Sequence, residues 1–339
     1  MTEVNVIGAG VAGLCVSAEL AARGAKVTLY ERAETLGPAS CSWWAGGMLA
    51  PWCELESAEE PVAEHGKYAA NWWQQHAGGV TREGSLVVTL ARDRNELDRF
   101  ARRTRNYEWL AATAIGQLEP DLEGRFIRAL YFKSEAHLSP RAITARLLER
   151  LRGSGVDIRL GSEVSAEQLD GPTVDCRGFG ARDRLTDLRG VKGEMLLVYC
   201  PDIALRRPIR LLHPRIPLYI VPREEPGMYM VGATMLESSE RSRITARSLL
   251  ELLGAAYALH PAFGEAEVVE IGVDARPAFP DNLPRIRKID NVIYANGLYR
   301  HGFLLSPSLA QMVAARVLNG DTSGTWHDKA ASMADKARA

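Results

Sequence analysis

The chain has 339 residues, of which 46% are hydrophobic and 24% are charged, and its 41 basic and 42 acidic residues leave a formal charge of −1. This composition excludes a largely disordered chain or a fibre, and the balanced charge offers no attraction to nucleic acid or to an anionic membrane. No apolar run approaches the roughly 18 residues of a membrane-spanning helix, and the first residues lack the basic segment of a signal peptide, so we expect neither anchor nor leader.

The cysteines are odd in number and widely spaced, with no C-x-x-C pair and no zinc-finger spacing. This pattern favours free, buried thiols in a reducing, cytoplasmic setting and predicts no metal site. A redox-sensing thiol is the less favoured interpretation. The five residues are Cys15, Cys41, Cys53, Cys176 and Cys200.

The first thirty residues form the clearest pattern. Residues 4–7 are an apolar, β-branched run typical of a buried parallel strand, and the glycine-rich segment 8–13 follows it. Residues 14–22 are rich in alanine and predict a helix, and residues 26–30 predict a second strand that ends at Glu31. Together these elements make a complete β-α-β unit.

The segment G-A-G-V-A-G has the spacing of a dinucleotide-binding loop. Gly8 permits the tight turn, Gly10 lets a pyrophosphate approach the backbone, and Gly13 allows the helix to pack closely on the strand. The N–H groups at the start of the helix would face the pyrophosphate, and Glu31 would accept hydrogen bonds from the ribose hydroxyls. A turn that binds nothing is less favoured, because the strand, the helix and the acidic residue are all present.

Helices and strands alternate less regularly along the rest of the chain. Ser139-Pro140 and Ser306-Pro307 each have the N-cap and first-turn residues that begin a helix. In chain order we predict a helix at 61–75, a strand at 85–90, helices at 94–105 and 140–151, a strand at 156–160, several strands within 190–235, a helix at 247–259, a strand at 292–295 and a helix from 306 to 317. The polar tail beyond Asp321 is expected to be a surface helix or a frayed end.

This order predicts an α/β fold with two domains. Residues 1–80, 136–185 and 286–320 would form a discontinuous, Rossmann-like nucleotide-binding domain. Residues 81–135 and 186–285 would form a smaller, mostly antiparallel-sheet substrate domain, and residues 321–339 a C-terminal tail. We see no internal repeat.

The loop motif serves FAD and NAD alike, so the choice between them needs other evidence. The motif begins the chain and a second nucleotide-domain segment ends it, which favours FAD. Residues 297–305 form a glycine-bracketed loop before Ser306, and its N–H groups and the helix end could stabilise negative charge on a reduced flavin ring. An ordinary strand-loop-helix junction is the alternative for this segment.

Four segments, in order and spanning about nine-tenths of the chain, carry a resemblance to a known family. They are G-A-G-V-A-G with Glu31-Arg32, A-G-G-M-L-A-P at 45–51, Y-I-V-P at 219–222 with V-G-A-T-M at 231–235, and A-R-P at 275–277 with D-N-L-P at 281–284 and Tyr299-Arg300. The chain resembles the D-amino-acid oxidase-like FAD-dependent oxidoreductases, and among them the glycine oxidases of thiamine biosynthesis. This resemblance implies that the discontinuous domain is a Rossmann-like, FAD-binding domain of the glutathione reductase type.

The resemblance implies which residues bind the cofactor and the substrate. Arg276 would hold the substrate carboxylate, helped by Tyr219 and Arg300. The residues implied at FAD are Gly8, Gly10, Val11, Ala12, Gly13, Glu31, Arg32, Cys41, Ser42, Gly46, Gly47, Met48, Val164, Leu298, Tyr299, Arg300, His301, Gly302, Phe303 and Leu304.

The chain also departs from the family pattern. Trp43 and Trp44 stand where small or hydroxyl residues are usual, His301 stands where asparagine is frequent, and Cys53-Glu54 lies near the expected substrate pocket. These departures leave the substrate range open.

The chemistry expected of such a site needs little from the side chains. The planar guanidinium of Arg276 suits a carboxylate, and Pro277 restricts the arginine to an extended backbone. The family transfers a hydride directly to flavin N5, so we predict no side-chain base; His137, His213 and His301 are candidates only by default. Dioxygen would reoxidise the flavin and be reduced to hydrogen peroxide. The oxidised substrate, an imine, would hydrolyse to an oxo acid and ammonia or be used in thiazole formation.

Several alternatives remain open. The activity could be that of a D-amino-acid oxidase, a sarcosine oxidase or an amine dehydrogenase, while a non-catalytic flavin-binding subunit and an NAD-dependent dehydrogenase belong to other classes. We expect a homo-oligomer, a small amino-acid substrate, and no nucleic-acid or membrane partner. The flavin should be non-covalent, because relatives that attach it use a cysteine near the C-terminal loop and no cysteine follows Cys200.

Overall fold

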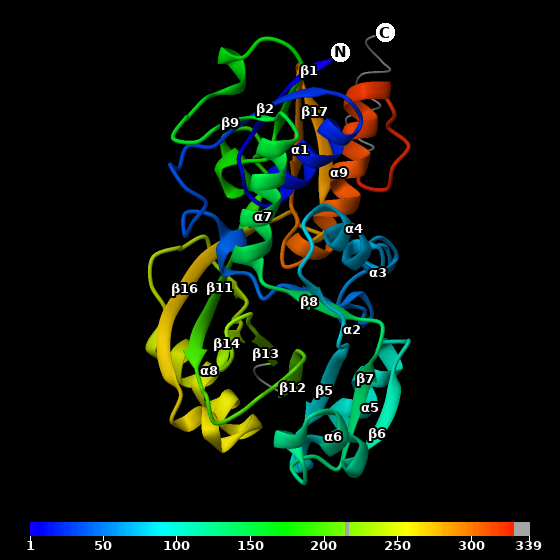
Figure 1. Cartoon of the computed structure of the whole chain (residues 1–339), viewed down its shortest axis with the longest axis vertical. Coiled ribbons are helices and arrows are strands. Elements are labelled where there is room, and N and C mark those ends of the chain that lie inside the picture. Colours follow the sequence, from blue (N-terminus) through cyan, green and yellow to red (C-terminus); the bar gives the residue numbers. More distant parts are fainter. Residues whose placement is uncertain (214–216, 329–339) are drawn as a thin grey trace.

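The computed structural model describes residues 1–213 and 217–328, and its strands gather in two lobes, one above the other in Figure 1. The upper lobe holds a six-stranded sheet, and the lower lobe a larger, mostly antiparallel sheet. Among the described residues, no helix has the length and apolarity needed to cross a membrane.

The upper sheet draws its strands from three distant stretches of the chain. Five of the strands are parallel, and the edge strand β17 is antiparallel to its neighbour. In spatial order they are β17 (Arg285–Ile289), β18 (Val292–Asn296), β10 (Thr173–Asp175), β1 (Glu3–Ile7), β2 (Lys26–Tyr30) and β9 (Asp157–Arg159).

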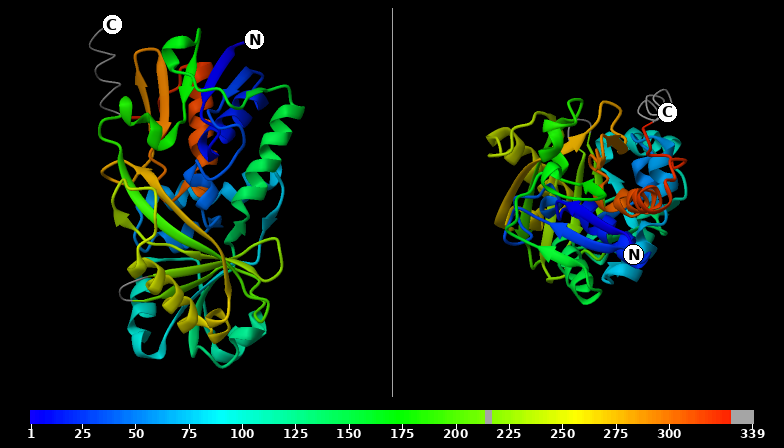
Figure 2. Two further views of the ribbon diagram at one scale, coloured as in Figure 1. Left: turned by 90° about the vertical axis from the view of Figure 1, so that its left-hand side faces the viewer. Right: turned by 90° about the horizontal axis from the view of Figure 1, so that it is seen from above.

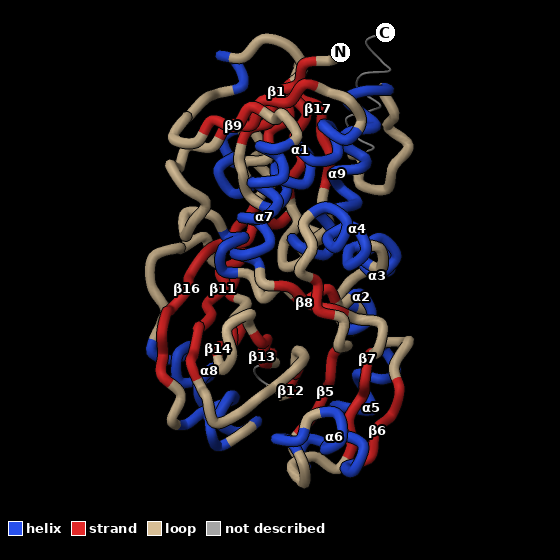
Figure 3. The backbone as a smooth tube through the Cα atoms, viewed as in Figure 1, coloured by secondary structure: helices blue, strands red, loops and turns tan. Residues whose placement is uncertain are grey.

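Three long helices pack along this sheet, as the helix and strand colours of Figure 3 show. They are α1 (Val11–Ala22), α7 (Pro140–Gly153) and α9 (Gly302–Asn319), and α1 contacts both of the others. The core between them consists of fully buried aliphatic side chains, such as Val6 and Leu29 from the sheet and Leu14 and Leu309 from the helices. Apolar strands covered by helices are typical of a parallel sheet.

The lower sheet is built around a long two-stranded ribbon. The strands of this ribbon, β11 (Arg189–Tyr199) and β16 (Glu267–Ala278), pair along their whole length and reach up to the first lobe (Figures 1 and 2). Apart from β16, which pairs with β11, the strands of this sheet lie in the spatial order β15 (Leu236–Glu237), β11, β14 (Met228–Gly232), β13 (Leu218–Pro222), β12 (Ile209–Leu212), β5 (Ser85–Thr89), β7 (Arg128–Phe132) and β6 (Glu108–Ala111).

Shorter elements complete the lobes and join them. A small sheet of β3 (Met48–Leu49), β8 (Ala136–Leu138) and β4 (Val80–Thr81) lies between the two lobes. The other α-helices are α2 (Pro51–Glu54), α3 (Glu60–Gly66), α4 (Ala69–His76), α5 (Arg94–Arg103), α6 (Ala112–Leu118) and α8 (Ala246–Leu259). The 3-10 turns are η1 (Cys41–Trp44), η2 (Ala91–Asp93), η3 (Pro120–Leu122), η4 (Ala166–Gln168), η5 (Gly178–Asp183) and η6 (Pro261–Gly264).

The two sheets give the predicted domain boundaries a structural basis, and we keep those boundaries as a proposal. Strands of the upper sheet come from residues 3–30, 157–175 and 285–296, and strands of the lower sheet from residues 85–132 and 189–278. The long ribbon contacts both lobes, so the division is not a clean hinge.

Two predicted helices differ from the structure. The predicted helix at 61–75 is two helices, α3 and α4, separated at Lys67 and Tyr68. The last helix begins at Gly302 rather than Ser306, which leaves Pro307 inside it. Proline there removes the N–H that would reach the Phe303 carbonyl, and the Trp73 indole donates to that carbonyl at 2.8 Å instead. This tertiary partner makes the internal proline compatible with the helix.

The prediction of a surface helix or a frayed end is wrong for residues 321–328. Trp326 is buried, with 2% of its surface exposed, and its indole donates to Ser308 of α9. The Ile286 amide of β17 donates to the Trp326 carbonyl at 2.7 Å, so the segment is tied to the upper sheet. The single apolar tryptophan outweighs the polar composition around it. Residues 329–339 of the predicted tail lie outside the described part.

Candidate active site

A cavity of about 430 Å³ is lined by residues of both lobes. It begins at the carboxyl end of β1, where the glycine-rich loop lies between β1 and α1, and reaches β16 and β13 of the lower sheet. In α/β folds the crevice at the carboxyl ends of parallel strands is the usual ligand site.

The glycine-rich loop is held in a conformation that side chains would block. Gly8 has φ +97°, and a methyl group at Gly13 would lie only 1.8 Å from the Gly8 carbonyl oxygen. Gly10 precedes α1 without a side-chain cap of its own, and the Val11 amide donates to Ser42 Oγ at 3.1 Å. The first turn of α1 therefore faces the cavity with backbone N–H groups and a favourable dipole for an anion.

Glu31 lies at the end of β2 and is fixed by backbone amides. Its carboxylate accepts hydrogen bonds from the Ala9 amide at 2.7 Å and from the Ala33 amide at 3.1 Å. The side chain lines the cavity together with Val164 of the following segment. A fixed carboxylate at the end of β2, the strand next to β1, suits the hydroxyls of a ribose.

The structure brings nearly all predicted site residues together. Every residue of the implied FAD set lines the cavity except Gly13, which packs α1 against the Gly8 backbone, and the implied substrate residues line it too. Because α9 begins at Gly302, Phe303 and Leu304 belong to its first turn rather than to a loop. Their individual roles remain predictions.

The two tryptophans that depart from the family pattern form part of the cavity wall. Trp43 and Trp44 belong to η1, and the Arg141 guanidinium lies over both rings, 4.3 and 5.3 Å from their centroids. A methyl group at Gly272 of β16 would lie 2.2 Å from the Trp44 ring. The indole of Trp44 thus packs on the bare backbone of the long ribbon.

Arg276 projects from β16 across a glycine of the neighbouring strand. A methyl group at Gly193 of β11 would lie 2.2 to 2.5 Å from the guanidinium atoms, so only glycine leaves room for it. Nη1 donates to the Thr234 carbonyl at 3.1 Å. Among the described residues no carboxylate forms an ion pair with Arg276, and its side chain lines the cavity.

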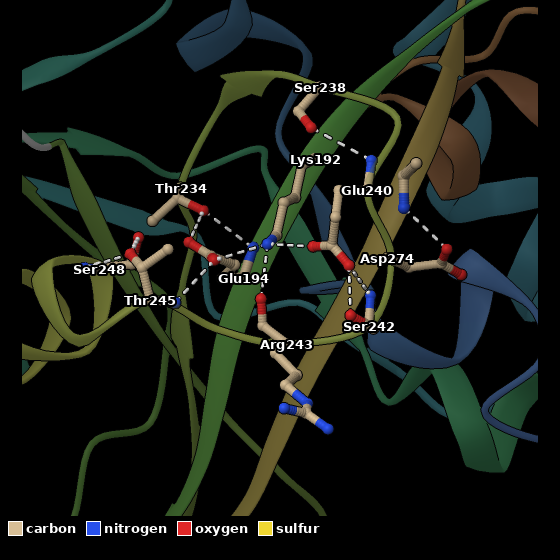
Figure 4. A network of polar contacts seen from close by, with 11 residues as sticks. Lys192, Glu194, Thr234, Ser238, Glu240, Ser242, Arg243, Thr245, Ser248 and Asp274 are labelled. Carbon is tan, nitrogen blue, oxygen red and sulfur yellow. Dashed lines mark hydrogen bonds and ion pairs between the residues drawn. The ribbon is translucent and has the colours of Figure 1, made fainter.

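A buried polar network fixes the acceptor of Arg276 (Figure 4). Lys192 and Glu194 of β11 are 5% and 0% exposed, and their charged atoms lie 3.3 Å apart. Lys192 also donates to Glu240 at 2.5 Å, and Glu194 accepts from Thr234 Oγ1 at 2.9 Å. Because Thr234 also supplies the carbonyl that Arg276 contacts, the network orients the guanidinium from behind. No motif in the sequence predicted this network.

Tyr219 and the A-G-G-M segment hold each other in place. Tyr219 lies on β13, and a methyl group at Gly46 would meet its ring at 3.0 Å. Arg223 donates to the carbonyls of Ala45 at 3.0 Å and Gly46 at 2.8 Å. Sequence reasoning found Tyr219 through its motif but missed Arg223, which follows the same strand.

Glu54 is a buried carboxylate that the sequence placed near the pocket without a role. It is 8% exposed, and its two oxygens lie 2.7 Å from Arg210 and 2.8 Å from Arg300. His301 Nδ1 is 3.5 Å from the same carboxylate. Arg300 also donates to Ser57, so this predicted substrate residue is engaged within the protein. Arg210 had not been predicted; an arginine alternating with aliphatic residues on β12 was the available signal.

The charge states of this cluster follow from its geometry. Burial disfavours the charge of Glu54, but the guanidinium groups of Arg300 and Arg210 outweigh it and hold the pKa of that carboxyl well below its usual range. Burial lowers the pKa of His301 to about 4, despite the attraction of the Glu54 carboxylate. At neutral pH the carboxylate is therefore ionised and the imidazole uncharged.

The other default candidates for a base lie elsewhere. His137 belongs to β8 and His213 follows β12, and neither lines the cavity. Burial lowers the pKa of His137 to about 4. Two cysteines do line the cavity: burial raises the pKa of Cys41 to about 12 and that of Cys176 further still. Both are neutral thiols, which are poor nucleophiles.

The chain is similar to known flavoproteins in sequence and in structure. The family model described as "DAO: FAD dependent oxidoreductase" matches residues 3–316. A Rhizobium etli protein named "Putative thiamine biosynthesis oxidoreductase ThiO" is 55% identical over 317 residues, which cover 93% of this chain and 96% of that protein. The crystal structure of glycine oxidase from Geobacillus kaustophilus superposes with a TM-score of 0.78 at 23% identity, over 95% of this chain and 96% of that one.

Another relative is longer than this chain. The Trichormus variabilis protein named "Bifunctional protein ThiO/ThiG" is 26% identical over 350 residues, which cover 92% of this chain but only 52% of that protein.

The residues present fit the cofactor in the family description. A Cβ at Gly8 would lie 2.8 Å from the Cys176 carbonyl oxygen and one at Gly13 would lie 1.8 Å from the Gly8 carbonyl oxygen, so the tight loop depends on both glycines, and the start of α1 offers N–H groups to a pyrophosphate. Glu31 suits the adenosine ribose, and the cavity continues past Gly46 to the strands of the lower sheet, as a long flavin nucleotide requires.

Proposed function

Because the chain belongs to the family of FAD-dependent oxidoreductases, which confirms the predicted fold class, cofactor and enzyme class, we propose that it is an oxidase of glycine and other small amino acids. The products would be the imine or its oxo acid, ammonia and hydrogen peroxide. The single observation that carries the proposal is the Arg276 guanidinium, which lines the cavity without a carboxylate partner among the described residues.

The substrate would be held by its carboxylate. Arg276 can offer two parallel N–H donors to it, and the Tyr219 hydroxyl can donate to an oxygen of the same group. The side chain of Arg276 is preset by Thr234 behind it and by the bare backbone of Gly193 beneath it. Such preorganisation fixes the α-carbon relative to the cofactor.

FAD, when bound, supplies the two-electron acceptor that dioxygen reoxidises with release of hydrogen peroxide. Among the described residues, Glu54 and His301 do not offer a proton acceptor suited to the amine. Glu54 is an ionised carboxylate whose two oxygens are paired with arginines, and the pKa of His301 near 4 makes it a weak base. The amine would therefore lose its proton to solvent before reaction, and catalysis would rest on positioning and electrostatics.

We further infer a place in thiamine biosynthesis. The support is the name of the 55% identical relative and the ThiO/ThiG fusions, in which a chain of this kind is joined to a second unit. In that setting the imine would be consumed directly by a thiazole-forming reaction. A strain that lacks the gene should then need thiazole or thiamine for growth, and growth without either would contradict the assignment.

The activity is tested on the purified flavoprotein. Glycine should bleach the flavin absorbance in the absence of oxygen and give hydrogen peroxide in its presence. Arg276→Ala should raise the KM for glycine by orders of magnitude, because a lost charge-assisted pair costs about 2–4 kcal/mol, while FAD remains bound. Sarcosine and D-alanine, assayed alongside, distinguish the related oxidases.

The contrary results are equally clear. An unchanged KM in the Arg276→Ala variant removes the anchoring role. Failure of glycine, sarcosine and D-alanine alike to bleach the flavin would favour a flavin-binding subunit without turnover. Bleaching without peroxide formation would indicate a dehydrogenase.

A further inference from the structure

Three arginines, Arg210, Arg276 and Arg300, line the substrate end of the cavity. Arg210 and Arg300 both contact Glu54, at 2.7 and 2.8 Å, whereas Arg276 donates to the Thr234 carbonyl and pairs with no carboxylate among the described residues. Within the described residues, Glu54 is the acidic group paired with this arginine set. The single negative charge of Glu54 is therefore shared between two guanidinium groups. Glu54 itself is buried and lies on α2.

The neighbouring groups do not alter this balance. Cavity-lining Arg241 is already paired with Asp274 at 2.5 Å. His301 touches the Glu54 carboxylate and is uncharged at neutral pH, because burial lowers its pKa to about 4. Arg210, Arg276 and Arg300 line the same cavity as His301.

On the premise of the proposed function, we propose that Glu54 selects the substrate class by occupying Arg210 and Arg300, so that the site accepts amino acids with one carboxylate and rejects those with a second acidic group. The single carboxylate of glycine would take Arg276. A second carboxylate entering the same space would meet the Glu54 charge and could gain a guanidinium only by displacing it, which makes Glu54 a repulsive element in specificity.

Removal of the Glu54 charge should change which acids the site binds. Glu54→Gln keeps the size of the side chain but frees a full positive charge at Arg210 and Arg300. A dicarboxylate could then bind Arg276 with one end and the freed arginines with the other. A monocarboxylate gains much less, since its only charged group already has a partner.

The test compares two competing acids, acetate and malonate, whose dissociation constants are measured from the change they cause in the flavin absorption spectrum. Glu54→Gln should tighten malonate relative to acetate by about tenfold to a hundredfold. In parallel, the ratio of kcat/KM for iminodiacetate over glycine should rise in the same direction.

Two further variants guard against a folding artefact. Glu54→Gln combined with Arg210→Gln removes one charge of each sign, so the malonate-to-acetate ratio should return toward that of the wild type. Glu119→Gln breaks a comparably buried pair, in which Arg207 Nε lies 2.6 Å from Glu119, but neither residue lines the cavity. It should leave the ratio unchanged even if it lowers stability.

The outcomes separate the inference from the proposed function. Equal changes for both acids in Glu54→Gln, a wild type that already prefers malonate, or a wild type that binds neither acid overturns the inference. A wild type that binds acetate selectively but is not bleached by glycine refutes glycine oxidation while the selection by Glu54 stands.

Discussion

At the scale of single residues, several glycines shape the cavity because they have no side chain. Gly193 has no unusual backbone angle, yet its missing side chain provides the space in which the Arg276 guanidinium lies. Gly46 does the same for the Tyr219 ring. The two side chains we assign to the substrate therefore rest on backbone rather than on other side chains, which limits the directions they can take.

Gly193→Ala should displace the anchor without touching the cofactor site. Its methyl group would fall within 2.5 Å of the Arg276 guanidinium, which must then move. We expect the KM for glycine to rise about tenfold or more while the flavin spectrum and FAD content stay unchanged. Steady-state kinetics and the flavin spectrum provide the measurement.

The matched control for this variant is Gly254→Ala. Gly254 is an exposed position in α8, and a methyl group there meets nothing within 4 Å. It should leave KM unchanged and raise stability by about 0.5–1 kcal/mol, as expected for alanine in a helix interior. A Gly193→Ala variant as active as this control would show that the guanidinium position is not critical.

At the scale of elements, a buried acid secures the short helix that carries Glu54. Glu135, in the turn between β7 and β8, accepts the Trp52 amide at 3.0 Å and the Cys53 amide at 2.8 Å, at the start of α2. Burial raises the pKa of Glu135 to about 7, although these N–H donors favour the charged form. The helix is thus held by a group that changes charge near neutral pH.

The sign of the resulting pH dependence is fixed by the direction of the shift. The folded protein binds the Glu135 proton more tightly than the unfolded chain, whose glutamate pKa is about 4.5. Its contribution to stability is therefore full below pH 4.5 and is lost as the pH rises to about 7. Between pH 5 and 8 the free energy of unfolding of the wild type should fall by about 2–3 kcal/mol more than that of Glu135→Gln.

Urea unfolding followed by tryptophan fluorescence at both pH values measures this difference. Glu83→Gln, at a half-exposed glutamate of the same lobe, should follow the wild type. Parallel curves for the wild type and Glu135→Gln would mean that Glu135 does not titrate in this range.

At the scale of the whole molecule, the flavin should be held by the two lobes without a covalent bond. The cavity thiols Cys41 and Cys176 are neutral because burial raises both pKa values, and no cysteine follows Cys200. Acid denaturation should release the yellow colour into the supernatant. Added FAD should stabilise the folded protein by about 2.7 kcal/mol when its free concentration is a hundredfold above Kd, and the melting temperature should rise accordingly. Colour that sediments with the protein would refute non-covalent binding.

Sequence patterns predicted features that lie within a short segment of the chain, and they missed contacts between residues that are far apart in the sequence. The loop of Gly8 to Gly13 and its flanking elements are encoded within thirty residues, so they could be predicted from spacing alone. The pair of Glu54 with Arg210 joins residues 156 positions apart, and no periodicity marks such a contact. The helix that contains Pro307 depends in the same way on Trp73, far away in the sequence. Family motifs led to Arg276, but not to the buried network behind it.

Segments of the two lobes alternate along the chain, and this order constrains how the polypeptide folds during translation. β1 and α1 are translated before every strand of the lower sheet, whereas β17, β18 and α9, which complete the upper lobe, follow all of those strands. The nascent upper lobe must therefore keep part of its apolar surface unsatisfied until β17, β18 and α9 have been made. Folding can begin at β1 during translation, but the upper lobe can be completed only after the whole lower sheet has been synthesised.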